Sequence, residues 1–411
     1  MTEILKVETE DQVLDTIKWA VAEKKPLDVR GAGSKSVLGR PTELDHVLDL
    51  SELSGVSFYE PAELVLSAGA ATPVAEVEAL LNDQNQQMAF EPPDLGSLLG
   101  SPAGGGTLGG LLACNLAGPR RIKAGSARDH FLGFTAVSGR GEVFKSGGRV
   151  VKNVTGFDLS KLMAGSYGTL AAMTEVTVKV LPTPEKIRTV LVTWAKDGIY
   201  DHGGNKAMTD ALASPHEVSG AAHLPATIAG RSAVNYVAGS GRAVTVIRVE
   251  GPEPSVAHRC EALRTLLAPL GDTEELHTQN SQILWREIRD ATYLTADQGR
   301  HIWRLSVPPK EGSRVALQIL EGWPGEVLYD WGGGLIWLAL GAAPDACAKL
   351  VRQCVTAVGG HAMLVRAPED VRDRVSVFEP QEGPLDEITR RIKDGFDPSR
   401  ILNPGRMHKE S

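Results

Sequence analysis

The sequence is poor in cysteine. Its 411 residues contain four, Cys114, Cys260, Cys347 and Cys354, and no two of them form a Cys-x-x-Cys pair. Zinc knuckles and iron–sulfur clusters need several closely spaced thiolates. We therefore expect the chain by itself to hold neither kind of centre, and we expect its cysteines to be buried free thiols.

Basic residues are also too few for a nucleic-acid surface. Lys and Arg number 43 against 51 Asp and Glu, which gives a formal net charge of -8 and a pI near 5.8. Surfaces that bind nucleic acid cluster Lys and Arg to neutralise phosphates. No nucleic-acid partner is expected.

No apolar run reaches the ~20 residues that span a bilayer. The longest is LIWLALGAA, residues 335–343. The N-terminal MTEILKVETEDQ carries acidic residues where a secretion signal needs a basic flank and an apolar core. We expect no transmembrane segment and a cytoplasmic location, with any membrane association peripheral, at the inner face and through partners.

The order of sequence patterns predicts two α+β domains and a tail. A helix is expected in TEDQVLDTIKWAVAEKK with Thr9 as its N-cap, and PLDVR reads as a buried strand after it. Alternating strands continue to Pro182 and Pro184, where the character of the sequence changes. Residues 185 to about 375 interleave strands with amphipathic helices, which is typical of an α+β domain with an antiparallel sheet, and the tail that follows is expected to be a helix and then a loop broken by proline.

The segment VRGAGSKS, residues 29–36, resembles two phosphate loops without matching either. A Rossmann fingerprint needs a third glycine at the position where this chain has Ser36. A Walker loop needs Gly-Lys-Ser/Thr where this chain has Ser34-Lys35-Ser36. A strand that runs into a tight glycine loop still exposes consecutive backbone N–H groups. Such a nest can bind a pyrophosphate without a P-loop lysine.

A second glycine-rich block, GSPAGGGTLGGLLACNLAG, covers residues 100–118. Glycine costs backbone entropy, so this many glycines indicate a close approach of the backbone or positive φ angles. A flexible linker is the alternative, but linkers are polar and LLACNLA is apolar. We favour contact with a ligand, and two glycine nests fit a long dinucleotide better than a mononucleotide.

Taken in order, these segments resemble the FAD-binding domain of the vanillyl-alcohol-oxidase (PCMH-type) flavoproteins. The likeness covers residues 5–184, and the closing DPSRILNPGRM looks like the C-terminal signature of the D-lactate and glycolate dehydrogenases. Within that branch the chain is most similar to the FAD-binding E subunits of glycolate oxidase. The resemblance implies a PCMH-type FAD-binding domain at 1–184, an α+β cap at 185–395 and a tail, 396–411, that returns to the FAD domain.

The resemblance also implies which residues bind FAD. The first loop would wrap the pyrophosphate, the second block would run along the flavin and ribityl chain, and three later segments would complete the site. A turn cap and a helix cap are the alternatives for Asn115 and Asp129. The FAD is expected to be non-covalent, because the first loop has no His or Cys for a link, and His130 reads as structural. The implied residues are Arg30, Gly31, Ala32, Gly33, Ser34, Lys35, Ser36, Gly105, Gly106, Thr107, Leu108, Gly109, Asn115, Ser126, Asp129, Gly168, Thr169, Val176 and Asn403.

The chain lacks the histidine motifs that catalytic members of this branch carry. Those histidines can hold a divalent metal or take the proton of the substrate hydroxyl, whereas the corresponding stretches here are YDWGGGLIWLAL and VFEPQEGPLDEI. No metal site is expected, and the catalytic residues stay unknown. Arg286 and Arg304 are candidates to bind a carboxylate, and a solvated or interface arginine is the alternative for each.

These observations lead to a main hypothesis and two alternatives. The main one is the FAD-binding subunit of a glycolate oxidase complex that converts glycolate to glyoxylate, acting as an electron relay or structural subunit. Its partners would be a D-type catalytic FAD subunit and an iron–sulfur subunit. The alternatives are an autonomous FAD-dependent oxidoreductase of a small 2-hydroxy acid, and a non-enzymatic module for another nucleotide.

Overall fold

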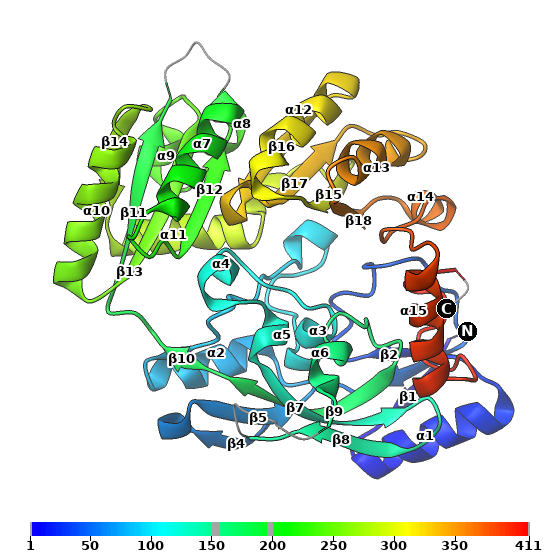
Figure 1. Ribbon diagram of the computed structural model, residues 1–411. Helices are drawn as coiled ribbons and strands as arrows, with labels where there is room; N and C mark the ends of the chain where they lie inside the picture. The colour runs from blue at the N-terminus through cyan, green and yellow to red at the C-terminus, as the bar shows by residue number, and fades with distance from the viewer. Residues whose placement is uncertain (1, 150–155, 195–199, 410–411) are drawn as a thin grey trace. The chain divides into compact units, whose positions relative to one another are not determined.

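The chain forms two compact units in the computed structural model, which describes residues 2–149, 156–194 and 200–409 (Figure 1). Each unit combines helices with antiparallel sheet, so the α+β class is confirmed. Unit 1 comprises Met1–Ala117, Gly125–Thr183 and Ser376–Ser411, and unit 2 comprises Gly118–Ala124 and Pro184–Val375.

This division differs from the expected domain limits at two places. Residues 118–124 lie in unit 2, where the Arg120 guanidinium pairs with the Glu250 carboxylate at 2.7 and 3.0 Å. Unit 1 resumes at Ser376 and not at residue 396, because helix α15 (Pro384–Phe396) packs on it. Arg140 Nε, for example, donates to the Gly395 carbonyl at 2.7 Å.

Unit 1 begins with a small parallel sheet against α1 (Glu10–Glu23). The predicted cap is confirmed, because Thr9 Oγ1 accepts a hydrogen bond from the Gln12 amide at 3.3 Å. The buried face of α1 shares one apolar core with Leu27 and Leu48 of the sheet. The strands, in the order β1-β3-β2, are β1 (Glu3–Lys6), β3 (His46–Asp49) and β2 (Leu27–Arg30).

A five-stranded antiparallel sheet forms the second part of unit 1. Its order is β4-β5-β9-β7-β8, and a separate short pair joins β6 to β10. Pro73 occupies the N-cap position of helix α2. The bounds are β4 (Val56–Glu60), β5 (Val65–Gly69), α2 (Val74–Asp83), β6 (Gln86–Gln87), α3 (Leu108–Ala113), α5 (Ala127–His130), β7 (Phe131–Ser138), β8 (Val143–Gly147), α6 (Leu159–Met163), β9 (Ala171–Lys179) and β10 (Leu181–Pro182).

Unit 2 is built on an eight-stranded sheet in the order β14-β11-β13-β12-β16-β17-β15-β18. Every described pair of neighbours is antiparallel. Helices α10 and α11 pack on β11, and α13 packs on β18 and α12. The strands are β11 (Lys186–Thr193), β12 (Gly220–Leu224), β13 (Val244–Gly251), β14 (Asp272–Leu276), β15 (His301–Ser306), β16 (Gly325–Asp330), β17 (Leu335–Leu340) and β18 (His361–Arg366). The helices are α4 (Arg121–Ala124), α7 (Tyr200–Ala213), α8 (Ala226–Ala229), α9 (Asn235–Ala238), α10 (Glu253–Leu267), α11 (Thr278–Arg289), α12 (Gly312–Gly322), α13 (Ala348–Thr356) and α14 (Glu369–Arg374).

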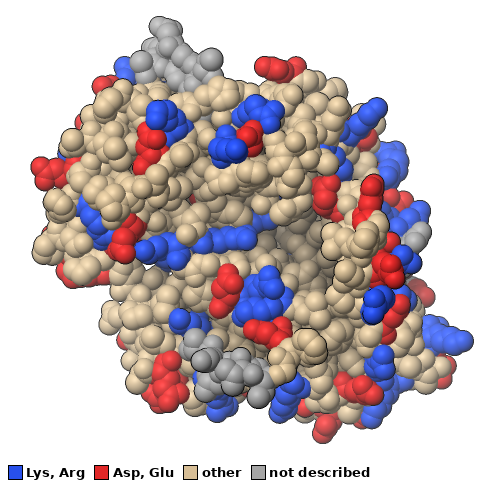
Figure 2. Space-filling model, viewed as in Figure 1, with Lys and Arg blue, Asp and Glu red and all other residues tan. Residues whose placement is uncertain are grey.

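Two surface properties bear on the partners of the chain. Within the described ranges, no helix has the length and the apolar character needed to cross a bilayer. On the face drawn in Figure 2, basic and acidic side chains are interspersed.

Candidate functional site

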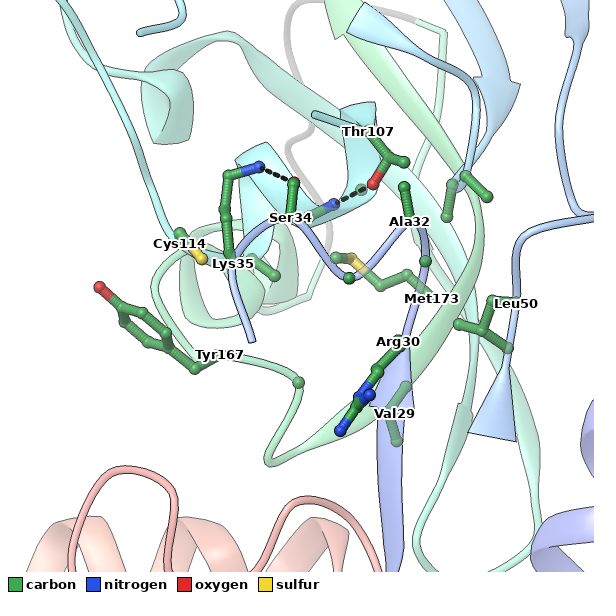
Figure 3. A pocket seen from close by; sticks show the side chains of 18 of the residues that line it. Val29, Arg30, Ala32, Ser34, Lys35, Leu50, Thr107, Cys114, Tyr167 and Met173 are labelled. Carbon is green, nitrogen blue, oxygen red and sulfur yellow. Dashed lines mark hydrogen bonds between the residues drawn. The ribbon is translucent and has the colours of Figure 1, made fainter. Parts of the chain in front are cut away.

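Unit 1 contains a pocket whose walls come from six parts of the chain (Figure 3). They are the end of β2 with the loop after it, the residue after β3, the residues after β5, helix α3 with residues just before it, the start of β9 with its preceding turn, and the C-terminal tail. The lining residues are Val29, Arg30, Gly31, Ala32, Gly33, Ser34, Lys35, Ser36, Leu50, Ala70, Ala71, Thr107, Gly109, Gly110, Ala113, Cys114, Tyr167, Gly168, Ala171, Met173 and Arg406.

The first wall is the loop predicted as a backbone nest. After β2 the chain turns at Gly33, which has a φ of 71°. A residue with a Cβ would be strained in this conformation. Two successive turns follow, because the Ser36 amide donates to the Gly33 carbonyl at 3.0 Å and the Leu38 amide donates to the Lys35 carbonyl at 3.0 Å. A Cβ on Gly33 would meet no atom within 4 Å, so its surroundings are open.

The second glycine block lies directly against this loop. A Cβ on Gly31 would lie 3.1 Å from Thr107 Oγ1, and one on Gly105 would lie 3.4 Å from the Ser34 Cβ. Gly109 packs so closely on β5 that its Cβ would lie 2.7 Å from the Ala70 carbonyl oxygen. The glycines therefore let two backbones approach each other across some seventy residues of sequence, and a linker does not explain them.

Helix α3 begins in this contact. Thr107 is its N-cap, and its Oγ1 accepts from the Gly110 amide at 3.3 Å. The side chain of Lys35 extends toward the helix, beside Cys114 (Figure 3). Burial lowers the pKa of the Lys35 ammonium, and burial raises the pKa of the Cys114 thiol.

A third wall precedes β9 and is fixed by the tail. Asn403 is almost fully buried, and its Oδ1 accepts from the Val29 amide at 2.8 Å while its Nδ2 donates to the Tyr167 carbonyl at 2.9 Å. Gly168, at φ 71°, lies so close that a Cβ would meet Asn403 Nδ2 at 2.7 Å. One amide thus joins the end of β2 to the turn before β9.

The predicted site residues divide into those that line the pocket and those that do not. Ten line it, and Gly105 and Gly106 border the first loop. Leu108 and Val176 are fully buried in the core, Thr169 Oγ1 bonds the Ser166 carbonyl at 2.7 Å, and Asn403 supports the wall as described. The ten are Arg30, Gly31, Ala32, Gly33, Ser34, Lys35, Ser36, Thr107, Gly109 and Gly168.

Asn115, Ser126 and Asp129 make capping hydrogen bonds near α5, which agrees with the alternatives stated for Asn115 and Asp129. Asn115 Oδ1 accepts from the Arg128 amide at 3.0 Å. Asp129 Oδ2 accepts from the amide and the hydroxyl of Ser126 at 2.7 and 2.9 Å. Although burial opposes ionisation, these two bonds lower the pKa of Asp129.

Several lining residues were not identified from the sequence. Cys114 was expected to be buried like the other cysteines, but it is partly exposed and lines the pocket. Tyr167, Met173 and Arg406 also line the pocket. They lie beside residues that the resemblance implies for FAD binding, but they were not themselves among the predicted residues. The signal that could have found them is their position, one to three residues away from Gly168, Val176 or Asn403. Arg406 matters most, because its guanidinium bonds the first loop.

The candidate carboxylate ligands lie in unit 2. Arg286 is exposed on α11. Arg304, on β15, stacks on the Trp331 ring at 5.0 Å from its centroid, and Arg121 stacks on the same ring at 4.3 Å. In the part of the chain that the structure describes, no group of three or more His, Cys, Asp or Glu could hold a metal ion.

The pocket suits an extended ligand that carries phosphates. Glycines and small side chains make up much of its lining, and Gly33 and Gly168 within it have positive φ. A side chain at Gly31 or Gly109 would press on the facing segment. Peptide N–H groups and one partly buried ammonium can donate hydrogen bonds to a diphosphate, and apolar walls can hold the rest of a dinucleotide.

Comparison with known proteins identifies the same region. Residues 2–147 match the family model for an FAD binding domain. The glycolate oxidase subunit GlcE of Escherichia coli (strain K12) is 33% identical over 398 residues, which cover 97% of each chain. The glycolate oxidase subunit GlcD of Bacillus subtilis (strain 168) is 26% identical over 283 residues, covering 66% of this chain and 56% of the relative.

Solved structures agree with the fold. p-Cresol methylhydroxylase with substrate bound has a TM-score of 0.74 at 14% identity, covering 99% of this chain and 88% of the other. The 4-ethylphenol oxidase of Gulosibacter chungangensis has a TM-score of 0.71 at 15% identity, covering 99% and 89%. At these identities the likeness shows the fold alone.

Proposed function

Because this chain belongs to the family of the glycolate oxidase subunit GlcE and carries an FAD binding domain, we propose that it serves a complex that oxidises glycolate to glyoxylate. It is an FAD-dependent oxidoreductase of the PCMH-type fold. The observation that carries the proposal is the unit 1 pocket, in which the first loop and the second glycine block meet.

The residues of the pocket supply binding and orientation. The glycine loop after β2 presents peptide N–H groups to a diphosphate, and Thr107 and Ser34 add hydroxyls beside it. Leu50, Met173 and Ala171 offer apolar contacts, which exclude water from a flat ring system. Bound FAD supplies the chemistry, which is the acceptance of a hydride and the release of electrons.

We propose an electron-relay or structural role for the chain within that complex. The proposal is supported by the sequence, because both histidine motifs of the catalytic members are replaced here. A D-type FAD subunit would then oxidise glycolate, and an iron–sulfur subunit would carry the electrons onward. The four cysteines of this chain are free and widely spaced, so a separate subunit would have to supply the cluster. The cytoplasmic location, with contact to the membrane only through partners, stays a prediction.

One observation favours a second candidate, an autonomous oxidoreductase of a small 2-hydroxy acid. Arg121 and Arg304 converge on Trp331 in unit 2. Guanidinium groups bind carboxylates in a bidentate fork, and Trp331 holds an unusual φ of 53°, which costs energy and occurs often at functional sites.

Anaerobic mixing with substrate separates the two candidates. The isolated, FAD-loaded chain is mixed with glycolate or D-lactate, and the flavin absorbance is followed. The relay role predicts no bleaching with the isolated chain and rapid bleaching when the D-type subunit is added. Bleaching of the isolated chain would contradict the relay role, and its loss in Arg304→Gln would then support the autonomous enzyme.

A further inference from the structure

We propose that Lys35 and Arg406 form a two-cation clamp on the diphosphate of FAD, and that this clamp makes the C-terminal tail part of the cofactor site. The inference rests on the proposed FAD site. It adds two charged side chains to the backbone nests, and it assigns a role to a tail residue that the sequence pattern did not indicate.

Lys35 places its ammonium where the second glycine block has no side chains. Its Nζ lies 3.4 Å from the position that a Cβ on Gly106 would take and 4.0 Å from that on Gly110. It makes a long hydrogen bond of 3.4 Å to Ser34 Oγ. The ammonium is therefore held between the two glycine blocks, within the pocket (Figure 3).

Arg406 reaches the same loop from the tail. Its Nη2 donates to the Lys35 carbonyl at 2.8 Å and its Nε donates to the Leu38 carbonyl at 3.3 Å. Its own carbonyl accepts from the Arg40 amide at 2.8 Å. The approach is so close that a Cβ on Gly39 would lie 2.8 Å from that carbonyl oxygen. Arg406 also lines the pocket, so the residue that bonds the loop also borders the space assigned to the ligand.

A bound anion would stabilise the positive charges of both residues. Burial lowers the pKa of Lys35, and the nearby guanidinium of Arg406 lowers it further, while Cys114 and Asp94 oppose the shift. Asp94 is engaged elsewhere, since its oxygens accept from the amides of Gly96 and Gly104 at 3.0 and 2.6 Å. Two adjacent phosphates would offer one acceptor to each cation and further acceptors to the glycine N–H groups.

The experiment titrates FAD into the FAD-depleted full-length chain and follows flavin fluorescence. The variants are Lys35→Gln, Arg406→Gln and Arg406→Lys, with Lys145→Gln and Arg391→Gln as exposed controls of the same charge change. Each titration is made at ~0.01 M and ~1 M ionic strength, where the Debye length falls from about 30 Å to about 3 Å.

We expect Lys35→Gln and Arg406→Gln each to raise the Kd for FAD by ~10–100-fold at low salt. The rise in Kd that salt causes in the natural chain should be smaller in both variants. Arg406→Lys, which keeps the charge but loses the planar fork, should give an intermediate Kd. Both control variants should bind as the natural chain does.

The outcomes separate the inference from the proposed function. If the natural chain binds FAD and both glutamine variants bind within about twofold of it, the clamp is wrong and the FAD site stands. Weaker binding with an unchanged salt dependence would also overturn the clamp, because it would show a role in loop packing without charge. If the natural chain does not bind FAD, the proposed function fails.

Discussion

The side-chain amide of Asn403 accepts a hydrogen bond from the backbone amide of Val29 at 2.8 Å, across 374 residues of sequence. The same side chain donates to the Tyr167 carbonyl at 2.9 Å. Two walls of the pocket therefore depend on one residue near the C-terminus. The tail is a structural part of the site that the first loop begins.

Replacing Asn403 with alanine should loosen both walls. The variant leaves the Val29 amide and the Tyr167 carbonyl without these partners, which costs about 1–3 kcal/mol for each buried group left unsatisfied. We expect a lower free energy of unfolding in urea and a lower FAD content after purification. Asn82→Ala, on the exposed side of α2, is the control. Equal stability and equal FAD content in Asn403→Ala would contradict this account of the tail.

Gly33→Asp should abolish FAD retention. The substitution forces a side chain onto a residue at φ 71° and brings a negative charge to the loop assigned to the diphosphate. Gly33→Ala is the matched control, because a Cβ there meets no atom within 4 Å and costs only about 1–2 kcal/mol of backbone strain. We expect the alanine variant to keep FAD with reduced affinity. A normal flavin content in Gly33→Asp would refute the assignment of the loop.

Acid should destabilise unit 2 through Glu250. Burial opposes its ionisation, but Arg248 and Arg120 lower the pKa of Glu250 from 4.5 to about 2. A carboxyl group whose pKa is lowered by folding stabilises the protein above its unfolded pKa and loses that contribution as the pH falls to the folded pKa. The shift corresponds to about 3 kcal/mol, lost between about pH 4.5 and pH 2.

Urea unfolding of the natural chain and of Glu250→Gln checks this prediction. At neutral pH the variant should be less stable by about 3–5 kcal/mol, because it leaves two arginines without their buried partner. The difference between the two proteins should shrink as the pH falls below about 4.5. A difference that stays constant across this range would show that Glu250 keeps the same charge throughout.

The buried pair of Lys393 and Asp397 should hold the tail in place. Lys393 Nζ donates to Asp397 Oδ2 at 2.7 Å and to the carbonyls of Thr169 and Leu402 at 2.6 and 3.0 Å. Removing one partner of such a pair leaves a buried charge, at a cost of about 3–5 kcal/mol. We expect Lys393→Met to unfold at a lower urea concentration and to release FAD faster.

An exposed pair of the same spacing supplies the control for that variant. Lys206 Nζ and Asp210 Oδ2 are 2.8 Å apart, four residues apart in α7, and the Lys206 side chain is 62% exposed. Lys206→Met should change stability by less than about 0.5 kcal/mol. If Lys393→Met were as mild as Lys206→Met, the buried pair would have no such role.

Local sequence signals predicted much of the fold. The N-cap of α1 and the strand β2 that runs into the glycine loop depend on residues close together in the chain. The glycine loop and the glycine block could also be identified in the sequence, because positive φ angles and close backbone approach favour glycine. The structure brings both to one pocket.

Contacts between distant residues could not be predicted in this way. Residues 118–124 belong to unit 2 because Arg120 pairs with Glu250, 130 positions later. Arg406 reaches Lys35 across 371 positions. From the sequence alone, an arginine in either segment is expected to lie at the surface, because its partner is far away in the chain. The sequence likewise predicts Cys114 as a core residue, because the distant segments that form the pocket around it cannot be seen in the local sequence. In the structure Cys114 lines the pocket.

The flavin content of the purified chain tests whether the unit 1 pocket holds FAD. We expect a yellow protein that carries one FAD per chain, or a depleted protein that takes up one FAD per chain on titration, and we expect Gly33→Asp to take up none. A colourless chain that cannot be reconstituted with FAD would show that the unit 1 pocket is not an FAD site.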